Sequence, residues 1–381
     1  PTSRCAKRKP VLSGVGLRLP VVACLAALAA GCANAATPTA SPTLLAAPAT
    51  GTATVPHPTA LPAPSASAAA NSTAAPIPTT ALPTVTLVSR PAWTSGAPSP
   101  LSRLELGAAV VDGKIYTVGG AVAAPQFIAV AEVLVYDPAT DTWAVAAPLP
   151  APRHHLGLAE LDGKLYAAGG YGENGAATRD AWVYDPVADA WTPIAPLPHN
   201  QGAHALVALG GKLYLAGGDF ARAGEPQRLT VYDPATGAWD ESLAPMPTGR
   251  EHLAAVAANG KLYVIAGRVG GGAGLTALEI YDPATNTWTA GPDLPAPTSG
   301  LTAAVLNGRI HVIGGENLVS GITVKAHQIL DLQSMTWSLA PEPPFSRHGL
   351  ASAVVEGRYY IINGGPIAGA TASDLVDIYT P

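Results

Sequence analysis

Six tryptophans recur along this chain at an almost constant interval, each following the one before it by 48 to 50 residues. They are Trp93, Trp143, Trp191, Trp239, Trp288 and Trp337. A glycine doublet has the same interval and ends at Gly120, Gly170, Gly218, Gly315 and Gly365; in the fourth copy Gly267-Arg268 is degenerate, and the doublet position ends at either 267 or 268. Such an interval is the signature of one structural unit copied along the chain, so the sequence predicts a repeat architecture.

Turn residues divide each unit into short apolar runs. Asp162-Gly163 lies between two such runs, which predicts a tight β-hairpin, and the equivalent turns end in Gly113, Gly211, Gly260, Gly308 and Gly357. Tyr-Asp-Pro-Ala-Thr recurs at 136–140, 232–236 and 281–285, where Pro presets a turn and Asp can bond its own backbone. Each unit is thus expected to hold four strands, the third ending at Tyr-Asp and the fourth carrying Trp.

A unit of about 49 residues buries little surface alone, so we expect neighbouring units to stack with the Trp faces between them. Trp93 has no doublet before it, and the strand expected at 375–379 has no Trp after it. The chain therefore starts with a fourth strand and ends with strands one to three. We predict an all-β, six-bladed propeller over residues 86–381, with four antiparallel strands per blade. The N-terminal strand closes it by joining the C-terminal blade, which removes exposed sheet edges.

The succession of Gly-Gly, Tyr-Asp and Trp with this period resembles the Kelch repeat from about residue 90 to 381. Three copies depart from the pattern: Gly267-Arg268 replaces the doublet, Asp331-Leu332 replaces Asp-Pro, and Tyr359–Gly365 has one extra residue. The resemblance implies a Kelch-type propeller. It also implies that ligands contact the starts of the inner strands and the loops after the doublets, at the same end of the channel.

The first 85 residues have a different composition. A basic head precedes the apolar run Leu19 to Ala30, which at 12 residues is too short to cross a bilayer and is typical of a secretory signal peptide. Leu28 to Cys32 resembles a bacterial lipobox, which implies lipid attachment at Cys32; cleavage after Ala35 and plain secretion is the alternative. We expect a signal peptide at 1–32 and, because 33–85 is rich in Ala, Pro, Thr and Ser without charge, a disordered tether there.

Charge and cysteine content exclude several functions. Without the five basic residues of the head, 16 basic residues remain against 26 acidic ones, which argues against binding nucleic acid. The same excess of acidic residues leaves the lipid anchor as the only expected membrane contact. All three cysteines precede the propeller, so we expect no disulfide or cysteine nucleophile in it.

Candidate site residues come from comparing the copies. Ten residues before each hairpin glycine, four copies have Arg, which predicts a scaffold role for Arg103, Arg153, Arg250 and Arg347. Two residues later, and after the doublets, the copies diverge, which is where an asymmetric function can lie. We predict that the ligand binds at the mouth of the channel to Glu105, His155, Tyr171, His204, Asp219, His252, Arg268 and Glu316.

The sequence gives weaker evidence for a metal site or a catalytic site at this mouth. His155 and His252 fall about two blades apart, so their spacing does not predict a compact metal site, and we expect neither metal nor cofactor. Asp219 and Glu316 are a conceivable acid/base pair across the mouth, but no catalytic residue is assigned.

Three functions stay open. The first is a monomeric binding module for a protein, peptide or glycan, exported and either membrane-anchored or secreted. The second, implied by the resemblance, is a sugar-modifying enzyme of the sialic acid mutarotase type. The galactose oxidase type is nearly excluded, since it needs a Cys crosslinked to Tyr and the propeller has no Cys. The third is a scaffold without a specific ligand.

Overall fold

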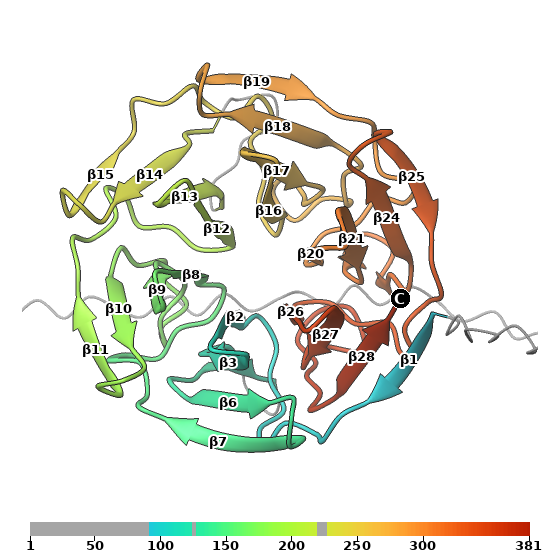
Figure 1. Cartoon of the computed structure of the whole chain (residues 1–381), viewed down its shortest axis with the longest axis horizontal. Helices are drawn as coiled ribbons and strands as arrows, with labels where there is room; N and C mark the ends of the chain where they lie inside the picture. Colours follow the sequence, from blue (N-terminus) through green and yellow to red (C-terminus); the bar gives the residue numbers. More distant parts are fainter. Residues whose placement is uncertain (1–90, 124–126, 219–226) are drawn as a thin grey trace, which may run out of the picture. The chain divides into compact units, whose positions relative to one another are not determined.

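The computed structural model describes residues 91–123, 127–218 and 227–381. They form six four-stranded antiparallel sheets arranged as a ring of blades (Figure 1). We number the blades 1 to 6 from the blade that begins with β2. The predicted six-bladed, all-β architecture is confirmed. Within the described ranges, no helix has the length and apolar character needed to span a bilayer.

The blades share one strand order, from the innermost strand outward. The first strands are β2 (Gly107–Val111), β8 (Gly157–Leu161), β12 (His204–Leu209), β16 (Ala254–Ala258), β20 (Thr302–Leu306) and β26 (Ala351–Val355). The second are β3 (Lys114–Val118), β9 (Lys164–Ala168), β13 (Lys212–Gly217), β17 (Lys261–Ile265), β21 (Arg309–Ile313) and β27 (Arg358–Ile362). The third are β6 (Val133–Asp137), β10 (Ala181–Asp185), β14 (Thr230–Asp233), β18 (Leu278–Asp282), β24 (His327–Asp331) and β28 (Val376–Thr380). The fourth are β7 (Thr142–Ala146), β11 (Ala190–Pro193), β15 (Ala238–Asp240), β19 (Thr287–Ala290), β25 (Thr336–Leu339) and β1 (Ala92–Ser95).

Blade 6 is built from both ends of the propeller, as predicted. Strand β1 pairs antiparallel with β28, with Ala92 opposite Thr380 and Ser95 opposite Asp377. Figure 1 shows the N-terminal strand lying beside the C-terminal one. The indole of Trp93 donates a hydrogen bond to the Pro341 carbonyl of blade 5 at 2.7 Å. The chain ends are therefore joined by backbone pairing and to the neighbouring blade by a side chain.

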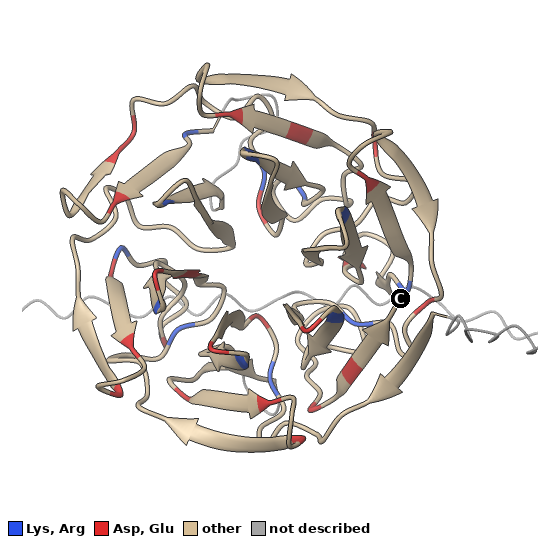
Figure 2. Cartoon of the chain, viewed as in Figure 1, with Lys and Arg blue, Asp and Glu red and all other residues tan. Residues whose placement is uncertain are grey.

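The predicted hairpins are all tight two-residue turns. In Asp112-Gly113 both residues have positive φ, 49° and 73°, and the five other turns are alike, including Glu356-Gly357. These are the dihedral angles of a type I′ turn, whose twist matches that of the flanking strands. The third strands end in Asp at the same end of the blades as these hairpins, and Figure 2 shows acidic residues there, for example on β6 and β10. The Asp137 and Asp185 carboxylates each accept a backbone N–H two residues on at 2.9 Å, as the motif predicted.

The backbone angles fix the register of the two irregular glycine doublets. Residues with positive φ show that the doublet position is occupied by Ala266-Gly267 in blade 4 and by Asn363-Gly364 in blade 6. The doublet position of blade 4 therefore ends at Gly267, one of the two expected alternatives, whereas in blade 6 it ends at Gly364, one residue before the predicted Gly365, so blade 6 has no extra residue. The second position needs glycine, because a Cβ at Gly120 would lie 2.9 Å from the Leu104 carbonyl oxygen. In blades 4 and 6 the first position is occupied by Ala266 and Asn363 at positive φ, whereas in blade 1 a Cβ at Gly119 would clash with the Arg153 carbonyl oxygen.

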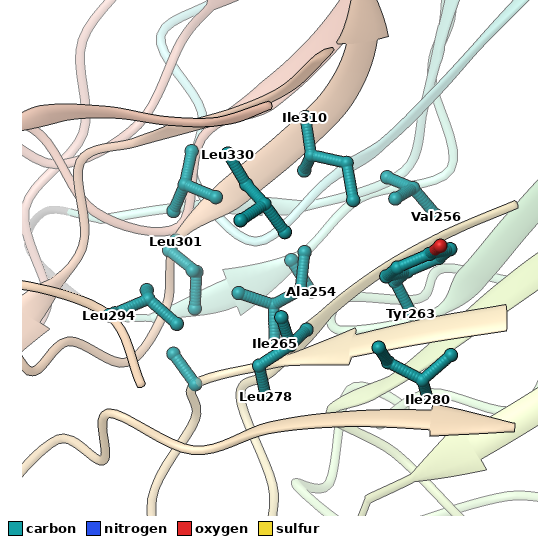
Figure 3. Packing of buried hydrophobic residues seen from close by; sticks show 12 residues of the cluster. Ala254, Val256, Tyr263, Ile265, Leu278, Ile280, Leu294, Leu301, Ile310 and Leu330 are labelled. Carbon is teal, nitrogen blue, oxygen red and sulfur yellow. The ribbon is translucent and has the colours of Figure 1, made fainter. Parts of the chain in front are cut away.

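The hydrophobic core is a series of clusters between neighbouring blades. In the cluster of Figure 3, Ile265 and Leu278 of blade 4 pack with Ile310 and Leu330 of blade 5, and all four are at most 1% exposed. The six periodic tryptophans pack against these clusters, as expected, but at their edges, where they stay half-buried. Each also donates its indole N–H to a carbonyl of the preceding blade at 2.7–3.0 Å.

The repeated arginines serve the scaffold, as predicted. The fully buried Arg103 guanidinium donates to the carbonyls of Gly119 and Glu132 at 2.8 and 3.1 Å, joining the second and third strands of its blade. Arg347 makes the equivalent bonds to Asn363 and Leu375 in blade 6. Such bonds hold the strand ends that shape the mouth.

Candidate functional site

A closed ring of backbone hydrogen bonds encircles the channel just before the first strands. One residue per blade contributes, and its N–H donates to the carbonyl of the equivalent residue in the preceding blade at 2.7–3.0 Å. The amide of blade 1 donates to blade 6 and completes the circle. The six ring residues are Glu105, His155, Ala203, His252, Gly300 and Gly349, and all have φ between 50° and 63°. Half of them therefore carry no functional group, and half carry an acid or an imidazole.

Bridges between backbones place the ring and the loops after the doublets at one end of the channel. His154 pairs with Tyr171, Glu251 with Arg268 and Ser299 with Glu316. Each pair joins the residue before the ring position to the residue after the doublet in the same blade. The expectation that both regions lie together is confirmed, and we call this end the mouth.

The mouth contains a buried network of charged and titratable side chains. It comprises Glu105, Glu251, Glu316, Arg268, His154, His155, His252 and His348. Arg268 bridges two carboxylates, with Nε 3.1 Å from Glu251 Oε1 and Nη1 2.8 Å from Glu316 Oε1. Its side chain is only 7% exposed, so these are charge-assisted bonds away from solvent.

The two ring histidines meet at the centre of the network. His155 Nε2 lies 3.0 Å from His252 Nε2 and 3.4 Å from Glu105 Oε2. His252 Nδ1 lies 2.8 Å from Glu251 Oε2. His155 Nδ1 contacts His154 Nδ1. The sequence interpretation that His155 and His252 are too far apart for a compact site is therefore wrong.

Burial and charge shift the pKa values of this network in opposite directions. Burial lowers the pKa of His154 to about 4 and holds the pKa of His155 well below its usual value, so both imidazoles are neutral at pH 7. Burial also acts to raise the pKa of Glu105, but His155 and His348 outweigh it and hold that pKa well below the usual range. For His348, burial is outweighed by Glu105 and Glu316, which raise its pKa.

A cavity of about 170 Å³ opens onto this network. Glu105, His155, His252, Arg268, Glu316 and His348 line it together with Phe127 and Leu318. The Phe127 ring meets the His154 ring edge-on, with centroids 4.8 Å apart. The mouth can thus offer a ligand acid, imidazole, guanidinium and aromatic groups within one small space.

Six of the eight predicted site residues lie in or against this network. Glu105, His155, His252, Arg268 and Glu316 belong to it, and the Tyr171 ring stacks on His154 at 5.1 Å. His204 does not: it takes the place of the leucine that follows the ring residue in the other blades, and its Nε2 lies 3.1 Å from the Ala168 carbonyl. Asp219 and the lipidation candidate Cys32 lie outside the described residues.

Sequence reasoning left four participants out of the predicted set. Glu251 and His348 each directly precede a ring residue, and this neighbouring position is the feature of the sequence that could have identified them. His154 is signalled in the same way. Phe127 had no such signal in the sequence. It lies in a loop with two added strands, β4 (Ala121–Val122) and β5 (Ile128–Ala129), which the repeat pattern does not predict.

Comparison with known proteins agrees with this architecture. The Kelch motif matches residues 102–150 and 152–198, and the KLHDC2/KLHL20/DRC7 Kelch-repeats domain matches residues 203–380. No curated protein is significantly similar to the chain. The two matches cover every blade of the ring, so the propeller is a Kelch-repeat domain.

Proposed function

We propose that this chain is an exported binding module, tethered to a membrane through Cys32, that captures a protein segment at the mouth of its propeller. The Kelch propeller fold suggests a protein-binding module. Because propellers serve many unrelated functions, the argument rests on the mouth itself rather than on the fold.

The observation that carries the proposal is a group of exposed apolar side chains on the loops beside the mouth. Phe127, Ile128, Val319, Ile322 and Ile367 are 37–73% exposed and lie on the loops between the second and third strands of blades 1, 5 and 6, which adjoin one another. Two of these loops are linked by a bond from Thr323 Oγ1 to the Pro366 carbonyl at 3.2 Å. Exposed apolar groups beside polar ones are typical of protein interaction sites.

A partner peptide could therefore place apolar side chains on this rim and a polar group in the cavity beside it. The cavity walls offer both signs of charge, from Glu105 and Glu316 on one hand and Arg268 on the other. This combination of an apolar contact area with a few directional polar groups is common in binding sites.

The test is a peptide-library screen with the full chain, followed by affinity measurement of the selected peptides. Replacing Phe127 with Ala and Ile322 with Ser should weaken binding at least about tenfold. The matched control replaces Val145 and Leu339 with Ser, since these are also exposed apolar residues but lie on outer strands. Loss in the control with retention in the rim variant would contradict the proposed face.

The tether is tested separately. Cys32→Ala should move the chain from the membrane fraction to the soluble exported fraction, whereas Cys24→Ala should leave it with the membrane. Recovery of both variants in the membrane fraction would contradict anchoring at Cys32.

One observation favours the mutarotase alternative: carboxylate and imidazole groups line a single cavity, as acid/base exchange of a sugar hydroxyl requires. It predicts faster anomeric exchange of sialic acid by NMR, lost in His155→Gln. Glycan binding without exchange, on an array, would instead favour the binding module.

A further inference from the structure

We propose that Glu105, His155 and His252 together bind one first-row divalent metal ion at the mouth, with Zn²⁺ the best match. The site goes beyond the proposed binding function and does not depend on it. Its three ligand atoms, one carboxylate oxygen and two imidazole nitrogens, all lie within 4.8 Å of one another.

The distances from His155 to the other two ligands match a shared ion. Two ligand atoms that are each about 2.1 Å from a metal and about 90–110° apart lie roughly 3.0–3.4 Å from one another. His155 Nε2 is 3.0 Å from His252 Nε2 and 3.4 Å from Glu105 Oε2. The two imidazoles converge although their residues are 97 positions apart in the chain.

The hydrogen bonds around the histidines leave the right atoms free. His252 Nδ1–H donates to Glu251 Oε2 at 2.8 Å, so its Nε2 presents a lone pair to the mouth. Such a carboxylate partner commonly orients a histidine that ligates a metal. Without a metal, the contact between the two Nε2 atoms needs a proton on His155 Nε2. In the metal-bound form the neutral His155 carries that proton on Nδ1 instead, where His154 Nδ1 can accept it, and both Nε2 lone pairs face the ion.

Charge balance points the same way. The buried network holds three carboxylates and one guanidinium, and Arg268 pairs with Glu251 and Glu316. Among the described residues, Glu105 has no Lys or Arg within 4.0 Å, although its side chain is only 12% exposed. Its neighbours that can carry positive charge are His155 at 3.4 Å and His348 at 3.8 Å, and His348 also pairs with Glu316 at 3.4 Å. A buried carboxylate without a strong cation is costly. A divalent ion beside Glu105 offsets this deficit.

The backbone holds the three ligands in an unusual conformation. Glu105, His155 and His252 have φ of 54°, 55° and 50°, where the ring residues of blades 5 and 6 are glycine. Side chains in this region cost about 1–3 kcal/mol each and cluster at functional sites. Nitrogen-rich ligands of this kind favour Zn²⁺ over Ca²⁺ or Mg²⁺. With three protein ligands, a coordination position stays open toward the cavity for water or a partner group.

The test uses the full chain after treatment with a chelator. We expect calorimetric titration with Zn²⁺ to show one ion per chain, and Co²⁺ to give visible absorption bands of imidazole-ligated cobalt. His155→Gln, His252→Gln and Glu105→Gln should each weaken Zn²⁺ binding at least about tenfold. His199→Gln is the matched control, because that imidazole is exposed and pairs with Glu241 away from the mouth.

Two results would overturn the site. The first is that the wild-type chain binds neither Zn²⁺ nor Co²⁺ at one equivalent and shows no rise in melting temperature with Zn²⁺. This result does not depend on whether any variant folds. The other is Zn²⁺ affinity within about twofold of wild type in any of the three variants, including Glu105→Gln alone. Circular dichroism of each variant shows whether a loss of binding reflects the ligand or the fold.

Discussion

At the scale of single residues, Gly349 decides where the Glu105 carboxylate can lie. A Cβ at Gly349 would be 2.5 Å from Glu105 Oε1, and φ there is +57°. We expect Gly349→Ala to lower the free energy of unfolding by about 1 kcal/mol through backbone strain. Because it also displaces Glu105, it should weaken Zn²⁺ binding. Urea unfolding and Zn²⁺ titration measure the two effects separately.

Gly300→Ala is the control for that change. Gly300 occupies the same ring position in blade 5, with φ of +63°, but a Cβ there meets no atom closer than 3.6 Å. Its strain should match that of Gly349→Ala while Zn²⁺ binding stays near wild type. Equal losses of Zn²⁺ affinity in the two variants would show that Glu105 placement is not the cause.

The same ring explains what the sequence could and could not predict about the site. Divergence among six aligned copies was enough to select Glu105, His155 and His252 as candidates. Their distances were not predictable from blade spacing, because the hydrogen-bonded ring is narrow and the intervening ring residue, Ala203, has a small side chain. Two imidazoles from blades 2 and 4 can therefore touch. The side-chain pairs around Arg268 depend on loop conformation, which the repeat pattern does not specify.

At the scale of strands, the composition of β1 alone would not predict that it forms the outer strand of blade 6. It is four residues long, yet it covers the edge of β28 and carries Trp93. The sequence predicts this strand because Trp93 keeps the interval of the repeat but has no glycine doublet before it, so it belongs to a fourth strand without its first three. The doublet register in blades 4 and 6 was not predictable in the same way, since Ala266 and Asn363 adopt positive φ without a glycine to mark it.

Removing residues 86–97 should therefore expose β28 as an unpaired edge and unfold or oligomerise the propeller. Two point substitutions distinguish the effect of exposing the β28 edge from the effect of losing one indole hydrogen bond. Trp93→Phe and Trp239→Phe each remove an equivalent indole bond, at 2.7 Å to Pro341 and at 2.8 Å to Ala195. Both should destabilise by about 1 kcal/mol, and only the deletion should change the mass measured by light scattering. A monomeric deletion variant with an unchanged melting temperature would contradict this role of β1.

At the scale of the whole molecule, the junction between blades 5 and 6 contains a buried histidine pair. His311 Nδ1 lies 2.9 Å from His327 Nε2. The His327 ring lies against Trp93 and Tyr379, with centroids 5.7 and 4.7 Å away. Burial lowers the pKa of His311 to about 3 and of His327 to about 4, so both are neutral in the folded protein at pH 7. The junction that closes the ring is therefore packed with imidazoles that must stay unprotonated.

This junction should make the closed ring sensitive to acid. A histidine whose folded pKa lies below its unfolded value of 6.5 contributes stability that is present above that value and is lost as the pH falls toward the folded pKa. Between pH 6.5 and 4.5, His327 should thus lower the free energy of unfolding by up to about 1.4 kcal/mol per pH unit. His327→Gln removes this contribution and should make the pH dependence shallower in urea unfolding, whereas His199→Gln, exposed and remote from the junction, should not. Identical pH dependences for wild type and His327→Gln would mean that the imidazole of His327 accepts a proton within the folded ring, and the acid sensitivity would then have to arise elsewhere, with His154, whose pKa burial also lowers to about 4, as the next residue to replace.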